Sequence, residues 1–119
     1  MVNKTDVTDL SSLTVRQLQA RRRRLARRLG DPEMTLRGIL ISQGRRCGKP
    51  GCRCAEGELH GPYTYLSVGR ATGTARLLYV PSLLADTVSR RVRATQAAEE
   101  ALAEISAINL ELLARRELQ

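Results

Sequence analysis

The first third of the chain has the pattern of one amphipathic helix. Thr14 and Gln17 have the spacing of a capping box, which favours a helix start at Thr14. Gly30, with a proline two residues later, is a stop signal. We therefore expect a helix from about residue 14 to residue 30, with Arg22 interrupting its apolar stripe. The stripe consists of Val15, Leu18, Leu25 and Leu29.

The middle of the chain has the pattern of short strands. An apolar run between residues 34 and 43 is too short for a typical helix. Residues 63–68 and 75–80 are rich in β-favouring side chains, and a glycine-bounded turn at residues 69–73 separates them. We expect a small antiparallel meander in which a long loop links the first two strands and a hairpin links the last two.

From Pro81 to Gln119 no glycine or further proline interrupts the pattern, which predicts one long helix starting at Pro81 or Ser82. It would extend about 55 Å, and the first helix could shield less than half of it. Its apolar residues have coiled-coil spacing, so we expect its exposed end to join copies into a homo-oligomer, a dimer or larger. Two alternatives stay open, an intramolecular hairpin and a kink near Thr95. The expected oligomerisation residues are Leu102, Ile105, Asn109 and Leu112.

The charge of the first helix indicates a binding role in addition to packing. The net charge is +8, and residues 16–53 contain twelve Lys and Arg but only two acidic residues. Such a polarised basic segment is typical of nucleic-acid binding. The alternative is that its arginines pair with glutamates of the long helix, although five glutamates cannot neutralise twelve basic residues. The expected nucleic-acid contacts are Arg21, Arg22, Arg23, Arg24, Arg27, Arg28, Arg45, Arg46, Lys49 and Arg53.

All three cysteines and the only histidine fall in the segment CGKPGCRCAEGELH, residues 47–60. Three thiolates and one imidazole on short glycine-containing loops are a donor set for tetrahedral structural zinc. Reduced thiols beside a surface histidine are the alternative, and Glu56 or Glu58 could replace a ligand. Spacing alone does not separate zinc from iron or cobalt. The expected ligands are Cys47, Cys52, Cys54 and His60.

These elements predict an α+β fold, a three-stranded antiparallel sheet with a Cys3His zinc loop between a basic N-terminal helix and a long coiled-coil-like C-terminal helix. We expect a flexible N-terminus at residues 1–13, a basic helix with a zinc-stapled sheet at 14–82, and an oligomerisation helix at 83–119. The core should be thin, since the chain has no Trp or Phe. Neither a signal peptide nor a membrane-crossing run is evident, so we expect a cytoplasmic protein without membrane contact.

The segment RGILISQGRRCGKPGCRCAEGELHGPYTYLSVGR, followed by ARLLYVP and a long helix, resembles a family of small uncharacterised bacterial, archaeal and phage-associated proteins. That family shares a Cys-Gly-Lys-Pro-x-Cys-x-Cys loop closed by His-Gly-Pro-Tyr, and its members are often associated with mobile elements. The resemblance covers about residues 37 to 81. It implies the same four metal ligands, with Gly61, Pro62 and Tyr63 as the tail of the motif. The arginine run is not part of it.

The leading functional hypothesis is a non-enzymatic, zinc-stabilised DNA-binding accessory or regulatory protein that works as an oligomer, nucleoid-associated if it binds DNA. DNA is favoured over RNA. A protein adaptor with purely structural zinc is the alternative, and a redox or metal sensor is a third class. No motif of an enzyme is present. We expect Tyr63 and Tyr65 to pack in the core rather than to stack on bases.

Overall fold

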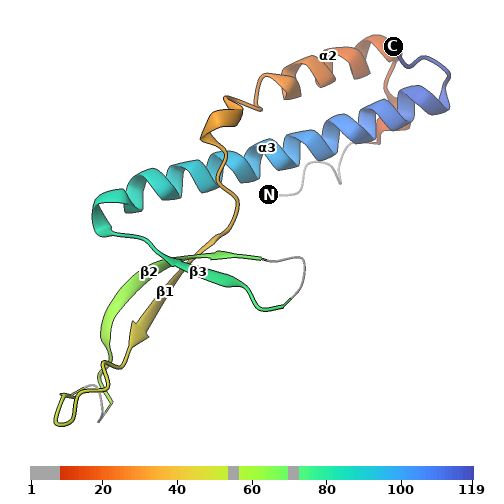
Figure 1. The fold of residues 1–119 in the computed structure, drawn as a ribbon. Coiled ribbons are helices and arrows are strands. Elements are labelled where there is room, and N and C mark those ends of the chain that lie inside the picture. The colour runs from red at the N-terminus through yellow and green to blue at the C-terminus, as the bar shows by residue number, and fades with distance from the viewer. Residues whose placement is uncertain (1–8, 54–56, 70–72) are drawn as a thin grey trace. The chain divides into compact units, whose positions relative to one another are not determined.

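The computed structural model describes residues 9–53, 57–69 and 73–119. It confirms the predicted fold class, with an N-terminal helix, a three-stranded antiparallel sheet and a long C-terminal helix (Figure 1). Two short 3-10 turns, Leu10–Ser12 and Pro32–Met34, flank the first helix. The main elements are α2 (Val15–Ala26), β1 (Ile39–Arg45), β2 (His60–Val68), β3 (Arg76–Tyr79) and α3 (Ser82–Ala114).

Helix α2 begins as the sequence predicts. The Thr14 side chain accepts a hydrogen bond from the Gln17 N–H, and the Gln17 side chain accepts one from the Thr14 N–H. This reciprocal pair satisfies two backbone donors that the first helical turn leaves open. The helix ends at Ala26 with Arg27 as its C-cap, four residues before Gly30. The predicted end at Gly30 was therefore too late.

One hydrophobic core joins α2 to the C-terminal part of α3. Leu18 of α2 and Leu112 of α3 are both fully buried. The two helices run antiparallel, since Leu10 lies near Arg115 while Arg22 lies near Asn109 (Figure 1). The stripe predicted for the first helix thus packs within the chain. The buried members of this core are Leu18, Leu25, Ala101, Ile108 and Leu112, with Leu10, Leu13, Val15, Leu29 and Ile105 packed against them.

Helix α3 stops at Ala114, before the predicted end at Gln119. The Glu117 N–H donates to the Leu112 carbonyl and the Arg116 N–H donates to the Leu113 carbonyl. Together with a φ of 62° at Arg116, these bonds form a Schellman cap. Such caps usually carry glycine at the left-handed position, and the arginine there explains why no stop signal is visible in the sequence.

The sheet has the order β1-β2-β3, as the meander predicts. Strand β1 begins later than the apolar run, at Ile39, because residues 32–34 form a 3-10 turn instead. One face of the sheet packs on the N-terminal part of α3, where Leu66, Val80 and Val92 are buried. Leu36, Leu40, Val68, Ala85 and Val88 pack against this second core.

The chain divides into two compact units, and α3 contributes to both. The first unit combines the chain up to Met34 with residues from Ala94 onward, and the second comprises Thr35–Arg93. Each half of α3 therefore has its own core. The part of α3 that the first helix is too short to cover packs against the sheet instead. Of the residues expected to join copies, Ile105 and Leu112 pack in the first core and Leu102 is exposed. Among the helices described, none is long and apolar enough to span a bilayer.

Candidate metal centre and basic surfaces

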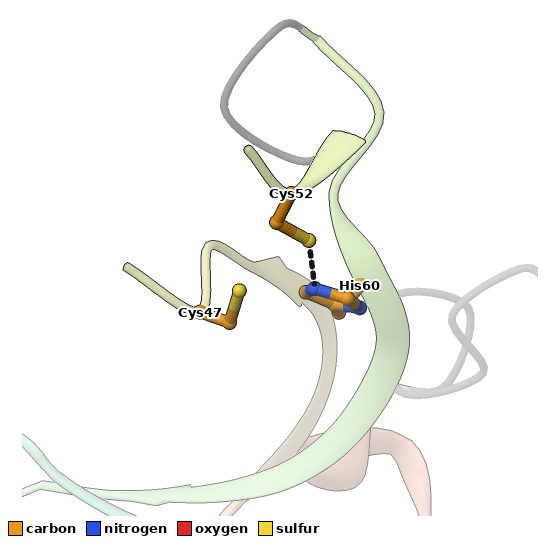
Figure 2. A group of neighbouring side chains, drawn as sticks. All are labelled: Cys47, Cys52 and His60. Carbon is orange, nitrogen blue, oxygen red and sulfur yellow. Dashed lines mark hydrogen bonds between the residues drawn. The ribbon is translucent and has the colours of Figure 1, made fainter. Parts of the chain in front are cut away.

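Three of the four predicted metal ligands converge in the second unit (Figure 2). The ligand atoms of Cys47, Cys52 and His60 all lie within 4.8 Å of one another. Cys52 Sγ lies 3.2 Å from His60 Nε2. Cys54, the fourth predicted ligand, lies outside the described residues. Two thiols and an imidazole, drawn from both sides of the loop, thus form a possible metal-binding cluster.

The turn between the two cysteines follows from its local sequence. The Cys52 N–H donates to the Lys49 carbonyl at 3.2 Å, which closes a four-residue turn. Pro50 occupies its second position and Gly51, with a φ of 78°, its third, as a type II turn requires. The Lys49 N–H also donates to Cys47 Sγ at 3.4 Å. A backbone donor to sulfur stabilises the thiolate form that binds metal.

The histidine is placed by an irregularity in the pairing of β1 with β2. From Gln43 to Arg45 the pairing advances two residues on β1 but three on β2, from Tyr63 to His60, so the extra residue lies in β2 and Arg45 lies opposite His60. Gly44 sits at this shift, where an added Cβ would come 2.8 Å from the Cβ of Leu59. Only glycine permits this approach without displacing its neighbour. The bulge therefore brings the histidine to the start of β2, beside the cysteine turn.

The three side chains fit a tetrahedral metal site. With metal–sulfur bonds of about 2.3 Å and metal–nitrogen bonds of about 2.0 Å, ligand atoms lie roughly 3.5 to 3.8 Å apart, so small side-chain movements would suffice. Cys47 and His60 are exposed and Cys52 is half-buried, so the cluster is open on one side. A hollow of about 450 Å³ adjoins it and is also lined by Arg45, Lys49 and Tyr63.

The structure sorts the predicted basic residues of α2 and of the turn after it into three groups. Arg21 forms an ion pair with Glu104 at 3.2 Å, and Arg22 donates to Asn109 Oδ1 at 2.7 Å. These two arginines face α3 and are engaged within the chain. Arg24 and Arg28 line a hollow of about 400 Å³ together with Arg21, Leu25, Glu100 and Glu104.

A row of arginines runs along the opposite side of α2. Arg16, Arg23 and Arg27 are spaced by seven and four residues, which places them on one helical face, away from buried Leu18 and Leu25. All three are exposed, and their side chains form no hydrogen bond or ion pair with any residue that the structure describes. We call these three residues the outer arginine row. Arg16 was absent from the sequence-based set, although its spacing from Arg23 could have identified it.

The remaining predicted basic residues lie in the second unit, around the metal cluster. Arg45, Arg46, Lys49 and Arg53 are all exposed. The Arg45 guanidinium lies over the Tyr65 ring, 4.7 Å from its centroid, and Arg45 Nε donates to the Tyr65 hydroxyl at 3.0 Å. The expectation that Tyr63 and Tyr65 belong to the core is wrong, because both lie on the other face of the sheet from the second core.

Comparison with known proteins identifies a family. A family model described as a domain of unknown function, DUF6788, matches residues 15–90. No curated protein and no solved structure matches significantly. The matched segment includes α2 with its arginines, the three strands and the loop that carries the cysteine and histidine ligands. Since this match covers more than half of the chain, the protein belongs to the DUF6788 family.

Proposed function

We propose that this protein is a non-enzymatic, metal-stabilised DNA-binding accessory or regulatory protein, and that its outer arginine row contacts the phosphates of duplex DNA. Three aligned arginines without acidic neighbours on their own helix face can each displace a counterion from the duplex. This arrangement is the observation that carries the proposal. Lys49 and Arg53 would add contacts from the second unit.

The geometry of the first unit favours phosphate binding on the outer row over the hollow beside α3. Glu100 and Glu104 line that hollow with three arginines and would repel an anion there. The outer row is separated from these carboxylates by the width of α2, about 10 Å, which is about one Debye length at physiological salt. The carboxylate charge is therefore largely screened where the row faces solvent.

In this proposal the bound metal is zinc and its role is structural. Cys47, Cys52 and His60 would hold it, and Cys54 would complete a Cys3His set. A metal cross-link suits a unit whose second core has only three buried apolar residues among those described. We also propose a cytoplasmic, nucleoid-associated protein that works as a homo-oligomer, and a link to mobile elements, on the basis of the cysteine and histidine motif.

A protein adaptor is the second candidate, and one observation favours it. Leu102, Leu110 and Leu113 of α3 are between 53% and 63% exposed, so the helix presents an apolar surface beside its packed face. Such leucines suit a second copy or a helix of another protein. This surface is compatible with DNA binding, since it lies on α3 and the outer arginine row lies on α2.

Duplex binding across a salt series tests the proposal. We expect measurable affinity for an arbitrary duplex at low salt, and a slope of log K against log salt of about −3 if three arginines each contact a phosphate, or steeper with second-unit contacts. Arg23→Gln and Arg27→Gln should each reduce the magnitude of this slope by about one. The measurement is fluorescence anisotropy of a labelled duplex.

The matched control is Arg116→Gln, which removes one exposed positive charge that is not part of the outer row. It should leave the slope unchanged, because net charge alone does not make a phosphate contact. Equal effects in all three variants would refute a specific role for the outer row. Absence of duplex binding at low salt would leave the adaptor as the better candidate.

A further inference from the structure

All three aromatic side chains of the protein lie on one face of the sheet. In the strand register, Ile41 pairs with Tyr65 and Tyr65 with Tyr79, while Ser67 pairs with Leu77. Side chains alternate between the faces of a strand, so this face is opposite the one that packs on α3. We call it the tyrosine face. Its members are Ile39, Ile41, Tyr63, Tyr65, Leu77 and Tyr79.

The tyrosine face is well exposed, although its residues are apolar or aromatic. Tyr79 is 58% exposed, Ile39 64% and Tyr63 37%. A chain with no Trp or Phe has few aromatics with which to fill its thin core, yet it places none of its tyrosines there. Exposed aromatics gathered on one surface mark a binding site more often than scattered apolar residues do.

The rings form a connected cluster rather than isolated side chains. The Tyr79 ring meets that of Tyr65 edge to face with centroids 5.9 Å apart, and that of Tyr63 with centroids 6.3 Å apart. The guanidinium stacked on Tyr65 adds a second planar group. Tyr63 also lines the hollow beside the metal cluster, with Arg45 and Lys49. The tyrosine rings, which can stack on planar groups, and the basic side chains therefore lie at the same end of the sheet.

The charge of this unit identifies the kind of partner. Residues 35–93 contain ten Lys and Arg and three Asp and Glu, a net charge of +7 out of +8 for the whole chain. A protein partner would have to be strongly acidic to match it, whereas a nucleic-acid strand supplies a charge at every nucleotide. Stacking on aromatic side chains requires bases that are not already stacked in a duplex.

We propose that the tyrosine face binds single-stranded nucleic acid, with unpaired bases stacked on Tyr63 and Tyr79 and the phosphates beside Arg45. This site is separate from the outer arginine row and does not rest on duplex binding. Stacking tolerates every base, so the site should show little sequence preference. DNA and RNA strands share this chemistry, and the experiment separates them.

The test uses protein labelled with 3-fluorotyrosine, in which Tyr63, Tyr65 and Tyr79 give the only fluorine signals. It is titrated with oligothymidine, oligouridine and abasic strands of about twelve nucleotides, a length within the range for such sites. We expect the Tyr63 and Tyr79 signals to shift with base-containing strands and to stay in place with the abasic strand. A greater effect of one sugar type identifies DNA or RNA as the ligand.

Affinity measurements on variants complete the test. Tyr63→Ala and Tyr79→Ala should each weaken strand binding by about 5- to 150-fold, the range for loss of one stacked base. Leu83→Ala is the control, since Leu83 is 93% exposed but lies on α3. Tyr79→Leu keeps an apolar side chain while removing the ring, and the remaining two fluorine signals report whether the sheet stays folded.

Either of two results would overturn the inference. The first is absence of fluorine shifts with every base-containing strand, which would leave the tyrosine face to a protein partner. The second is equal affinity for abasic and base-containing strands, which would show binding to phosphates alone. Arg23→Gln should leave single-strand affinity unchanged, so failure of the duplex proposal and failure of this one can be told apart.

Discussion

At the residue scale, the metal cluster depends on side chains that short turns bring together. Cys47 and Cys52 bracket a type II turn, and the bulge in β2 opposite Gly44 places Arg45 opposite His60. The Lys49 N–H donates to Cys47 Sγ and so holds this sulfur in place within the turn. This pre-organisation lowers the conformational cost of metal binding, because few side-chain rotations remain.

Cobalt substitution tests the ligand set and decides the part of Cys54. We expect cobalt(II) protein to show the bands of a tetrahedral thiolate site, with charge-transfer intensity reduced by about one third in Cys54→Ser if three thiolates bind. Cys52→Ser should show at least this loss, whereas His60→Ala should keep the thiolate transitions. Identical spectra for wild type and Cys54→Ser would remove Cys54 from the ligand set.

A second residue-scale feature is the polar contact within the core of the first unit. From the sequence, Arg22 interrupts the stripe of the first helix and Asn109 occupies a seam position of the long helix. In the structure they meet, with the guanidinium donating to the amide oxygen at 2.7 Å. Each polar residue therefore satisfies the other, and the pair fixes the register between α2 and α3.

A double-mutant cycle measures this contact. Arg22→Leu should lower the free energy of unfolding by about 1 kcal/mol, because it leaves a half-buried amide oxygen without its donor. Arg22→Leu combined with Asn109→Leu should recover most of that loss, giving a coupling energy above about 0.5 kcal/mol in urea denaturation. Arg23→Leu, on the exposed side of α2, is the control. A coupling energy near zero would contradict a register role.

At the element scale, α3 presents two apolar faces with different environments. Leu112 is fully buried against α2, while its neighbour Leu113 is 53% exposed. The coiled-coil spacing of the sequence mixes residues of both faces, since it predicts that Leu102 and Leu112 both join copies. Only the position of α2 separates the face that packs within the chain from the face that remains open.

Neighbouring leucines of α3 provide a matched comparison. Leu112→Ala should lower the free energy of unfolding by about 2 to 5 kcal/mol, since it opens a cavity in the first core. Leu113→Ala should change it by about 0.5 kcal/mol or less. Circular dichroism during urea unfolding measures both. A concentration-dependent loss in Leu113→Ala would instead place Leu113 in an interface between copies, and equal losses would contradict the observed packing.

At the scale of the whole molecule, charge and hydrophobic surface are divided between the two units. The first unit is nearly neutral, with ten basic and nine acidic residues, despite the arginine run of α2. The second holds a net charge of +7 together with the metal cluster and the tyrosine face. The duplex proposal therefore concerns the outer arginine row of the first unit, and the single-strand proposal concerns the tyrosine face of the second.

Features that depend on neighbours in the chain could be predicted from the sequence. The capping box at Thr14, the turn at Pro50-Gly51 and the strand order were all predictable, because local hydrogen bonds and backbone preferences produce them. The convergence of Cys47, Cys52 and His60 was predictable for the same reason, since short loops leave the ligands little freedom to separate. The Schellman cap at the end of α3 was not predictable, because arginine is unusual at its left-handed position.

Tertiary structure alone decided which side chains remain available for binding. Arg21 and Arg23 are equivalent in the sequence, yet only Arg21 faces the glutamates of α3. Tyr65 and Leu66 are neighbours on one strand, yet α3 covers the face of the leucine and leaves that of the tyrosine exposed. Such differences arise from contacts between segments far apart in the chain. Local periodicity sorts residues into faces, and only the packed partner determines which face is buried.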